Sequence, residues 1–274
     1  MADVLIGSEA LALGALTRGQ LRWRYRTIFP DVYIAKSATP KREQYVVGAW
    51  LWSRRRGVIA GIAAAARHGA PWFDQSAPIE LILECSRRPP GIVTRNERIE
   101  VDEIIDVDGV LFTTPERTAL DIARRLPRDS AVSHLDAVAR ATGVSASDVW
   151  PLVDRYAGAR GLRRAVIALS LMDAGSASAR QSQLRLALID GGLPPPMTHI
   201  KVTDGDTTAF VDMGYQGPMV GVVCSDRPPD LLARMGWTVI HAHDSHTTPR
   251  FVAHRVKSEL RRSGHVLSTL WTQS

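Results

Sequence analysis

Two β-rich runs lie on either side of a turn in Ala209-Phe-Val-Asp-Met-Gly-Tyr-Gln-Gly-Pro-Met-Val-Gly-Val-Val-Cys224. The second run, 219–224, is apolar throughout, which is typical of a strand buried at the centre of a sheet. Just upstream, His199-Ile-Lys-Val is followed by the turn Thr203-Asp-Gly-Asp. An Asp-Gly turn between two β-rich runs predicts a hairpin. This part of the chain therefore predicts the middle of a β-sheet.

Helices are predicted on both sides of these strands. Residues 180–189 place Leu184 and Leu188 four apart on one face, and Gly191-Gly-Leu-Pro-Pro-Pro ends the helix. A short helix, a strand and a closing helix are expected at 230–235, 237–242 and 251–262. Small residues at 173–179 precede all these elements and predict a domain boundary. We therefore expect residues 174–274 to form an α/β domain with a mixed central sheet.

The first 40 residues predict a different arrangement. Residues 8–14 and 17–26 indicate two helices, and Thr17 is a good N-cap for the second. Residues 31–35 are β-branched and aromatic, which predicts a strand. Helix, turn, basic helix and strand is the order of a winged helix-turn-helix, whose second helix enters the major groove of DNA. Residues 1–40 are therefore expected to be a winged-helix-like segment that begins an α+β front part.

Positive charge is concentrated at this end of the chain. Residues 1–56 contain ten basic and four acidic residues, an excess that equals the whole net charge of +6. Such a local excess indicates a polyanion partner, and the alternative is a solvated basic face. We expect Trp23 and Tyr25 in the core. The residues expected to contact DNA phosphates and base edges are Arg18, Gln20, Arg22, Arg24 and Arg26.

The middle of the chain, residues 41–173, is predicted to be a mainly helical domain with a few strands. The Ala-rich residues 58–68 predict a buried helix, and Pro115 occupies the first position of another, where its missing N–H costs nothing. Arg117 and Asp121 lie four apart on that helix and are expected to pair. Strands are expected at 78–83 and 91–100.

Composition limits the location of the protein. No apolar run reaches the roughly 18 residues needed to span a bilayer, so no membrane association is expected. Residues 1–10 carry Asp3 and Glu9 and have no basic segment, so they do not predict a signal peptide. Cys85 and Cys224 are far apart and predict neither a disulfide framework nor a zinc site. The expected location is the cytoplasm.

Residues 176–262 resemble the very-short-patch-repair-like endonuclease domain, a branch of the PD-(D/E)XK nuclease superfamily with a restriction-endonuclease-like fold. The motifs that carry the resemblance are Arg180-Gln-Ser-Gln-Leu-Arg-Leu-Ala-Leu, Gly192-Leu-Pro-Pro-Pro, Phe210-Val-Asp-Met-Gly-Tyr, Val220-Gly-Val-Val-Cys-Ser-Asp and Gly236-Trp-Thr-Val-Ile. The resemblance implies phosphodiester hydrolysis at Mg²⁺ held by carboxylates on the first helix and two strands.

This chain departs from the nuclease pattern at most of the metal-binding positions. The family's helix carboxylate corresponds to Gln181, its first-strand Asp is matched by Asp212, and its next-strand Glu and Asp correspond to Val223 and Ser225. One carboxylate is expected to bind Mg²⁺ poorly, because this ion prefers several anionic oxygens. We therefore expect a vestigial site of Asp212, Gln181 and Ser225, no catalytic residue and no cofactor. Metal binding, if any, would depend on Asp212.

The front half resembles the AbiEi-type antitoxin family over residues 8–125. The motifs are Ala10-Leu-Ala-Leu-Gly-Ala-Leu-Thr-Arg-Gly-Gln-Leu-Arg, Asp31-Val-Tyr, Ile59-Ala-Gly-Ile-Ala-Ala-Ala-Ala-Arg-His-Gly and Thr114-Pro-Glu-Arg-Thr-Ala-Leu-Asp. The resemblance implies a winged helix that binds operator DNA and represses its own operon. The implied partners are double-stranded DNA and a cognate toxin protein.

Three hypotheses remain open from the sequence. The first is a non-catalytic, antitoxin-like transcriptional autoregulator that carries a pseudo-nuclease domain. The second is a Mg²⁺-dependent DNA endonuclease, which requires a replacement carboxylate near Asp212. The third is a protein-interaction scaffold that neutralises a partner toxin and binds no DNA.

Overall fold

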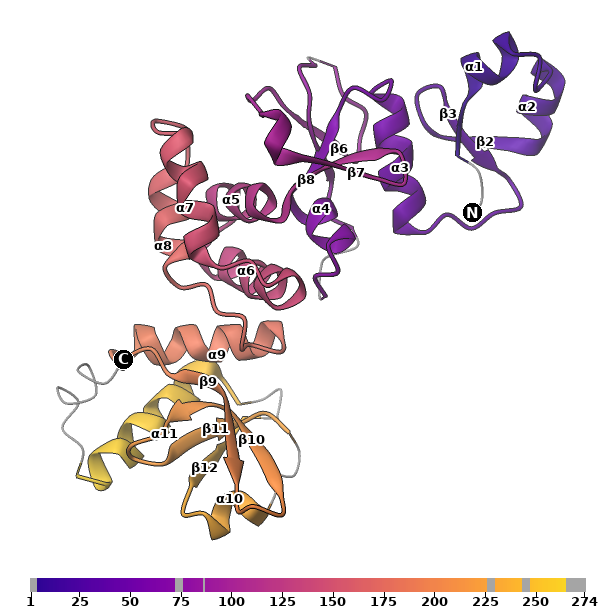
Figure 1. Cartoon of the computed structure of the whole chain (residues 1–274). Helices are drawn as coiled ribbons and strands as arrows, with labels where there is room; N and C mark the ends of the chain where they lie inside the picture. Colours follow the sequence, from indigo (N-terminus) through magenta and orange to yellow (C-terminus); the bar gives the residue numbers. More distant parts are fainter. Residues whose placement is uncertain (1–3, 72–75, 86, 226–229, 243–246, 265–274) are drawn as a thin grey trace. The chain divides into compact units, whose positions relative to one another are not determined.

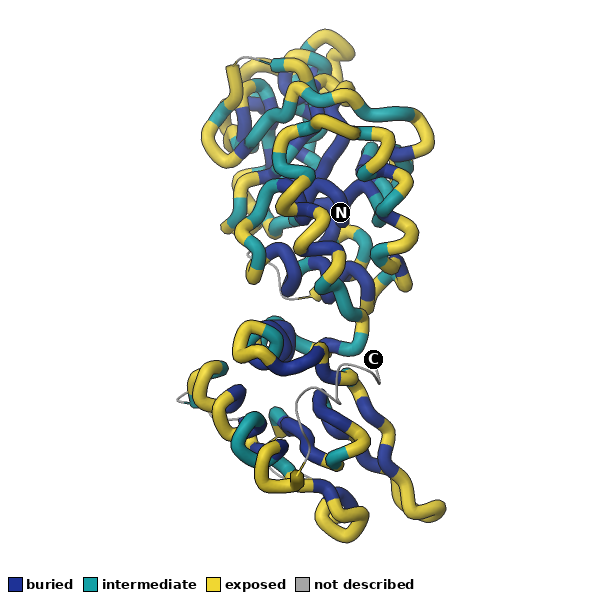
Figure 2. Tube along the Cα trace, turned by 90° about the vertical axis from the view of Figure 1, so that its left-hand side faces the viewer, coloured by how far each residue is buried: buried dark blue, intermediate teal, exposed yellow. Residues whose placement is uncertain are grey.

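The computed structural model describes the chain except residues 1–3, 72–75, 86, 226–229, 243–246 and 265–274 (Figure 1). It consists of two compact units, each built from two separate stretches of the chain that alternate along the sequence. Unit 1 contains Met1–Arg125 and Ala146–Ala165, and unit 2 contains Leu126–Ser145 and Val166–Ser274. In Figure 2 buried stretches of the chain alternate with exposed ones, and many of the outer turns are exposed.

Unit 1 begins with two short helices and a three-stranded antiparallel sheet. The order along the chain is β1 (Leu5–Ile6), α1 (Gly7–Ala12), α2 (Arg18–Arg24), β2 (Tyr25–Phe29) and β3 (Val32–Ala35). The strand order is β1-β3-β2, so β3 lies in the middle. Helix α3 (Arg42–Trp52) packs against this sheet and shares a core with Ile6, Phe29 and Val32. The two predicted helices and the predicted strand are present as α1, α2 and β3, and the structure adds two strands, β1 and β2, that the sequence did not predict.

Helix α2 is shorter than predicted. The sequence predicted a helix through Arg26, but α2 ends at Arg24 and Tyr25 has an extended backbone with ψ of 155°. The aromatic and β-branched residues of β2 pair with β3, where Tyr25 lies opposite Ala35. This pairing satisfies the backbone of residues that have a high β-propensity, so the prediction that the helix extends to Arg26 was wrong.

A five-stranded mixed sheet forms the second layer of unit 1, in the order β6-β5-β4-β8-β7. Its strands are β4 (Val58–Ala60), β5 (Ile79–Ile82), β6 (Ile92–Arg95), β7 (Ile104–Val107) and β8 (Val110–Thr113). The two predicted strands correspond to β5 and β6. The Ala-rich segment is a helix, α4 (Gly61–Arg67), only after its first residues, because Val58, Ile59 and Ala60 form a fully buried strand.

Helices complete unit 1 beyond this sheet. They are α5 (Pro115–Arg125), α7 (Ala146–Arg155) and the start of α8 (Leu162–Leu169), and a short 3₁₀ turn, Val101–Glu103, precedes β7. Pro115 is the first residue of α5, as predicted.

Unit 2 has a four-stranded sheet in the order β12-β11-β10-β9. Pairing is antiparallel between β9 (Met197–Thr203), β10 (Thr208–Tyr215) and β11 (Val220–Val223), and parallel between β11 and β12 (Thr238–His241). The predicted mixed sheet is therefore confirmed. Its helices are α6 (Arg128–Thr142), α9 (Ala179–Asp190), α10 (Asp230–Arg234) and α11 (Pro249–Arg262).

Apolar side chains of α9 and α11 join this sheet to its helices. Leu184 and Leu188 of α9 share a buried cluster with Met213 of β10 and Val252 of α11. The predicted i, i+4 pair on α9 is thus the face that meets the sheet. Within the described ranges, we find no helix with the length and hydropathy that crossing a membrane requires.

Candidate functional site

The basic surface of α2 is the first candidate site. Arg18, Arg22 and Arg24 are exposed, and their side chains form no hydrogen bond or ion pair within the described part of the chain. Thr17 caps the helix, and Gln20 closes a capping box by accepting a hydrogen bond from the Thr17 backbone N–H at 2.8 Å. Gln20 therefore fixes the start of α2, while the three arginines project from it.

Two predicted features of this surface differ in the structure. Arg26 lies on β2, where its guanidinium donates to the carbonyl of Ala38 at 2.6 Å, so it does not extend the arginine row of α2. Trp23 was expected in the core but is 76% exposed, because Leu21 supplies the buried face of this short helix. Tyr25 is partly buried.

The neighbouring acidic residues are neutralised by other arginines. Arg54 contacts Asp31 at 2.8 Å, and both guanidinium nitrogens of Arg55 contact Glu9 at 2.7 Å. The hydrogen bonds from Arg55 lower the pKa of Glu9 below its usual value. Positive charge on α2 is therefore not compensated by Asp31 or Glu9.

The second candidate site surrounds Asp212 on β10. The Gln181 side-chain amide donates to Asp212 Oδ1 at 2.9 Å, and the Cys224 backbone N–H donates to Oδ2 at 2.6 Å. The Gln181 carbonyl accepts from the backbone N–H of Ala177 at 2.5 Å, which fixes the orientation of the amide. The structure therefore brings Gln181 and Asp212 together, as the nuclease resemblance implied, and Ser225 is an exposed residue.

The donor set around Asp212 does not fit a divalent cation. Both carboxylate oxygens face N–H donors, and a cation at the same place would be repelled by those positive hydrogens. Burial, with Asp212 nearby, raises the pKa of the Cys224 thiol to about 12, so no thiolate is available at neutral pH. Within the described ranges no three His, Cys, Asp or Glu side chains are close enough to hold a metal, while His243 and His246 lie outside those ranges.

A buried ionic network in unit 1 surrounds Arg117 of α5. Its Nη1 donates to Glu103 and, at 3.0 Å, to Tyr156 Oη, and its Nε lies 3.2 Å from Asp121 Oδ1. The predicted pairing of Arg117 and Asp121 is therefore confirmed. Burial, together with the hydrogen bond to Glu103, raises the pKa of Tyr156 to about 12. Arg155 also contacts Glu103, at 2.7 Å.

A second buried ion pair joins α6 to α9 in unit 2. Arg185 Nη2 lies 2.8 Å from Asp136 Oδ2, and Ser182 donates to the same oxygen at 2.7 Å. The backbone N–H of Asp173 donates to Asp136 Oδ1 at 2.8 Å. Burial raises the pKa of Asp136, and Arg185 opposes this shift. Sequence reasoning missed this pair because its members lie 49 positions apart.

The segment that begins with α3 is similar to a known protein family. Residues 42–174 match the model of the AbiEi antitoxin C-terminal domain. This match covers α3 to α8 and starts directly after the N-terminal three-stranded sheet. It supports the antitoxin-like part of the predicted resemblance. The AbiEi match ends before α9, so it does not include Gln181 or Asp212.

Two curated relatives are similar over a shorter stretch. They are the uncharacterized proteins MT2308 and Rv2248 of two Mycobacterium tuberculosis strains, each 39% identical over 90 residues. The alignment covers 33% of this chain and 33% of each relative, so the chain spans about a third of the length of the curated relatives it matches.

Proposed function

We propose that this protein is an antitoxin-like, non-catalytic DNA-binding regulator of its own operon. The observation that carries the proposal is the row of exposed arginines on α2, which have no side-chain partner among the described residues and lie in the N-terminal elements that precede the AbiEi-like segment. Arg54 and Arg55 pair with Asp31 and Glu9, so their charge is compensated locally, whereas the α2 arginines form no such ion pair among the described residues.

The geometry of the first elements supports this function. Helices α1 and α2 are joined by a short turn, and the β2–β3 hairpin follows α2 directly. In a winged helix-turn-helix, the second helix lies in the major groove and the hairpin contacts the flanking backbone. Arg18, Arg22 and Arg24 would then contact phosphates and base edges, while Gln20 holds the N-terminus of the helix.

The double substitution Arg22→Ala with Arg24→Ala should weaken binding to duplex DNA from upstream of the gene. Each removed phosphate contact lowers the slope of log K against log salt by about 1, so we expect a fall of roughly 2 in that slope. Fluorescence anisotropy over a salt series measures both slope and affinity. The control is Arg163→Ala, an exposed arginine of α8 in the same unit. An unchanged slope in the double variant would contradict a phosphate-contacting role for α2.

We further propose that the C-terminal domain is a pseudo-nuclease. The support is chemical, because each oxygen of the Asp212 carboxylate already accepts a hydrogen bond, one from the Gln181 amide and one from the Cys224 backbone N–H. The endonuclease hypothesis needs at least one more anionic oxygen at this site. The closely placed side chains of Gln181 and Asp212 offer a direct way to test that requirement.

Gln181→Glu should convert the neutral partner of Asp212 into a second carboxylate. Without metal, the two charges repel, and we expect the melting temperature to fall by roughly 2–6 °C, since 1 kcal/mol shifts it by about 2–4 °C in a domain of this size. Added Mn²⁺ should reverse that loss in the variant and leave the native protein unchanged, as measured by differential scanning calorimetry. The control, Gln181→Glu with Asp212→Asn, should not respond to Mn²⁺. If Mn²⁺ stabilises the native protein and Mg²⁺ supports Asp212-dependent DNA cleavage, the protein is an enzyme.

A further inference from the structure

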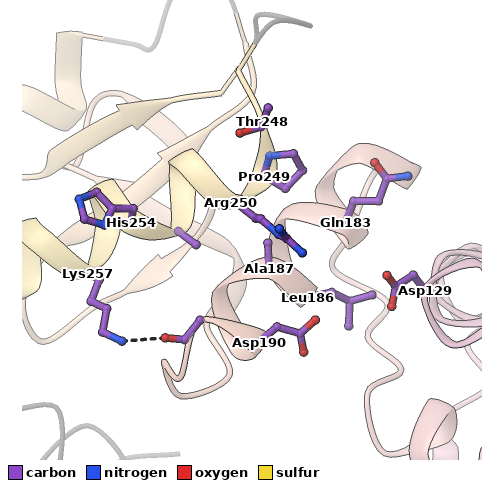
Figure 3. Close-up of a pocket in the computed structure, with 12 residues that line it drawn as sticks. Asp129, Gln183, Leu186, Ala187, Asp190, Thr248, Pro249, Arg250, His254 and Lys257 are labelled. Atoms are coloured by element: carbon purple, nitrogen blue, oxygen red, sulfur yellow. Dashed lines mark hydrogen bonds between the residues drawn. The ribbon is translucent and has the colours of Figure 1, made fainter.

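A groove of about 800 Å³ lies between α9 and α11 of unit 2, and Asp212 is not among the residues that line it (Figure 3). Its floor consists of small and apolar side chains, Leu186 and Ala187 of α9 and Ala253 of α11. The volume is within the range of ligand-binding clefts, and such clefts combine an apolar floor with a few polar groups. The floor can therefore accept apolar side chains from a bound molecule.

One wall of the groove is basic. Arg250 and His254 lie one turn apart on α11, both are exposed, and neither forms a hydrogen bond or ion pair with another described residue. Figure 3 shows the Arg250 guanidinium directed from α11 toward α9. Lys257 already donates to the carbonyl of Gly191 at 2.8 Å and closes one end. The available donors are thus those of Arg250 and His254, which fit a carboxylate.

The opposite wall is acidic and already partly neutralised. Asp190 at the end of α9 accepts two hydrogen bonds from Arg128, at 2.8 and 2.9 Å, and Asp129 lies 3.1 Å from the same guanidinium. Two carboxylates share one arginine, so this wall keeps a negative charge. A nucleic acid strand in the groove would meet that charge, whereas a peptide can present acidic side chains to α11 and neutral or basic ones to α9.

We propose that this groove binds an amphipathic helical segment of a protein partner. The apolar residues of that segment would lie on Ala187 and Ala253, and its acidic residues would face Arg250 and His254. Helix α9 has 12 residues and is therefore about 18 Å long, which matches three turns or so of a bound helix. This binding surface is separate from the arginines of α2, and the inference does not depend on DNA binding.

The test uses the full chain and a designed, fluorescein-labelled helical peptide of about 14 residues, roughly 20 Å long. The peptide carries leucines at i, i+3 and i+7 with glutamates along one flank, and its counterpart has lysines in place of the glutamates. We expect the acidic peptide to bind at least about tenfold more tightly than the basic one, a difference of roughly 1.4 kcal/mol. Anisotropy titration measures both affinities.

Variants on α11 connect that preference to the groove. Arg250→Glu should weaken acidic-peptide binding about tenfold, and Arg250→Ala should have a smaller effect in the same direction. Arg255→Glu is the matched control, since Arg255 is exposed on the same helix but does not line the groove. Equal affinity for both peptides, or equal effects at positions 250 and 255, would overturn the proposal. Loss of duplex DNA binding in Arg250→Glu would also overturn it, because the groove would then be a nucleic-acid site.

Discussion

Asp136→Ala should destabilise the protein by about 3–5 kcal/mol, since removal of one partner from a buried ion pair leaves the other charge uncompensated. Arg185 is 3% exposed and its only carboxylate partner is Asp136 among the residues that the structure describes. The guanidinium cannot lose its proton in the folded protein, so it cannot escape the cost of burial. Urea unfolding followed by circular dichroism would give the loss of stability.

The opposite truncation should cost less. In Arg185→Met, Asp136 can take up a proton, and burial already raises its pKa in the native protein. A folded pKa above the unfolded value means that stability falls as pH rises through this interval, so the variant should gain stability relative to the native chain from about pH 7 to about pH 5. Equal costs for the two single variants, with no such pH response, would show that the pair is not the source of the effect.

Arg117→Met should cost less, about 1–3 kcal/mol in unit 1, because its buried partners lose a donor but keep other arginines. The methionine fills most of the volume, and Glu103 and Asp121 each lose one cation, while Arg155 still contacts Glu103 and Arg125 still contacts Asp121. Tyr156 would lose both the guanidinium hydrogen bond and the ring contact, whose distance is 4.8 Å. Thermal unfolding would measure the loss, and Arg163→Met is a suitable exposed control. A cost below about 1 kcal/mol would mean that the network contributes little net stability.

Local patterns predicted the C-terminal unit well. The apolar run of β11, the Asp-Gly turn between β9 and β10, and the leucine pair of α9 each combine a strong local signal with a matching tertiary role. The nuclease resemblance, rather than a local pattern, predicted that Gln181 and Asp212 share a site, and the two side chains do lie together. No local pattern indicated that the Cys224 backbone N–H would occupy the other carboxylate oxygen, because that contact depends on the register between two strands.

Tertiary contacts decided the elements that local patterns missed. Residues 58–60 have neighbours of high helix propensity, yet they pair with both β5 and β8 at the centre of a sheet. Trp23 has a large apolar side chain of the kind usually found in a core. Leu21, however, is the buried residue of this seven-residue helix, and Trp23 lies on its exposed side. Asp136 and Arg185 carry no spacing signal, since their helices meet only in the folded chain.

The stretches of chain that form the two units alternate along the sequence, and this affects how the protein can fold during synthesis. The chain passes from one unit to the other after Arg125, Ser145 and Ala165. During synthesis, unit 1 lacks α7 until translation has passed α6, and α6 in turn waits for α9 to supply Arg185. Domains usually fold one after another as the ribosome releases them. Here neither unit is complete when the other begins, so no single truncation isolates either one, and α6 emerges well before the helix that supplies the ionic partner of Asp136.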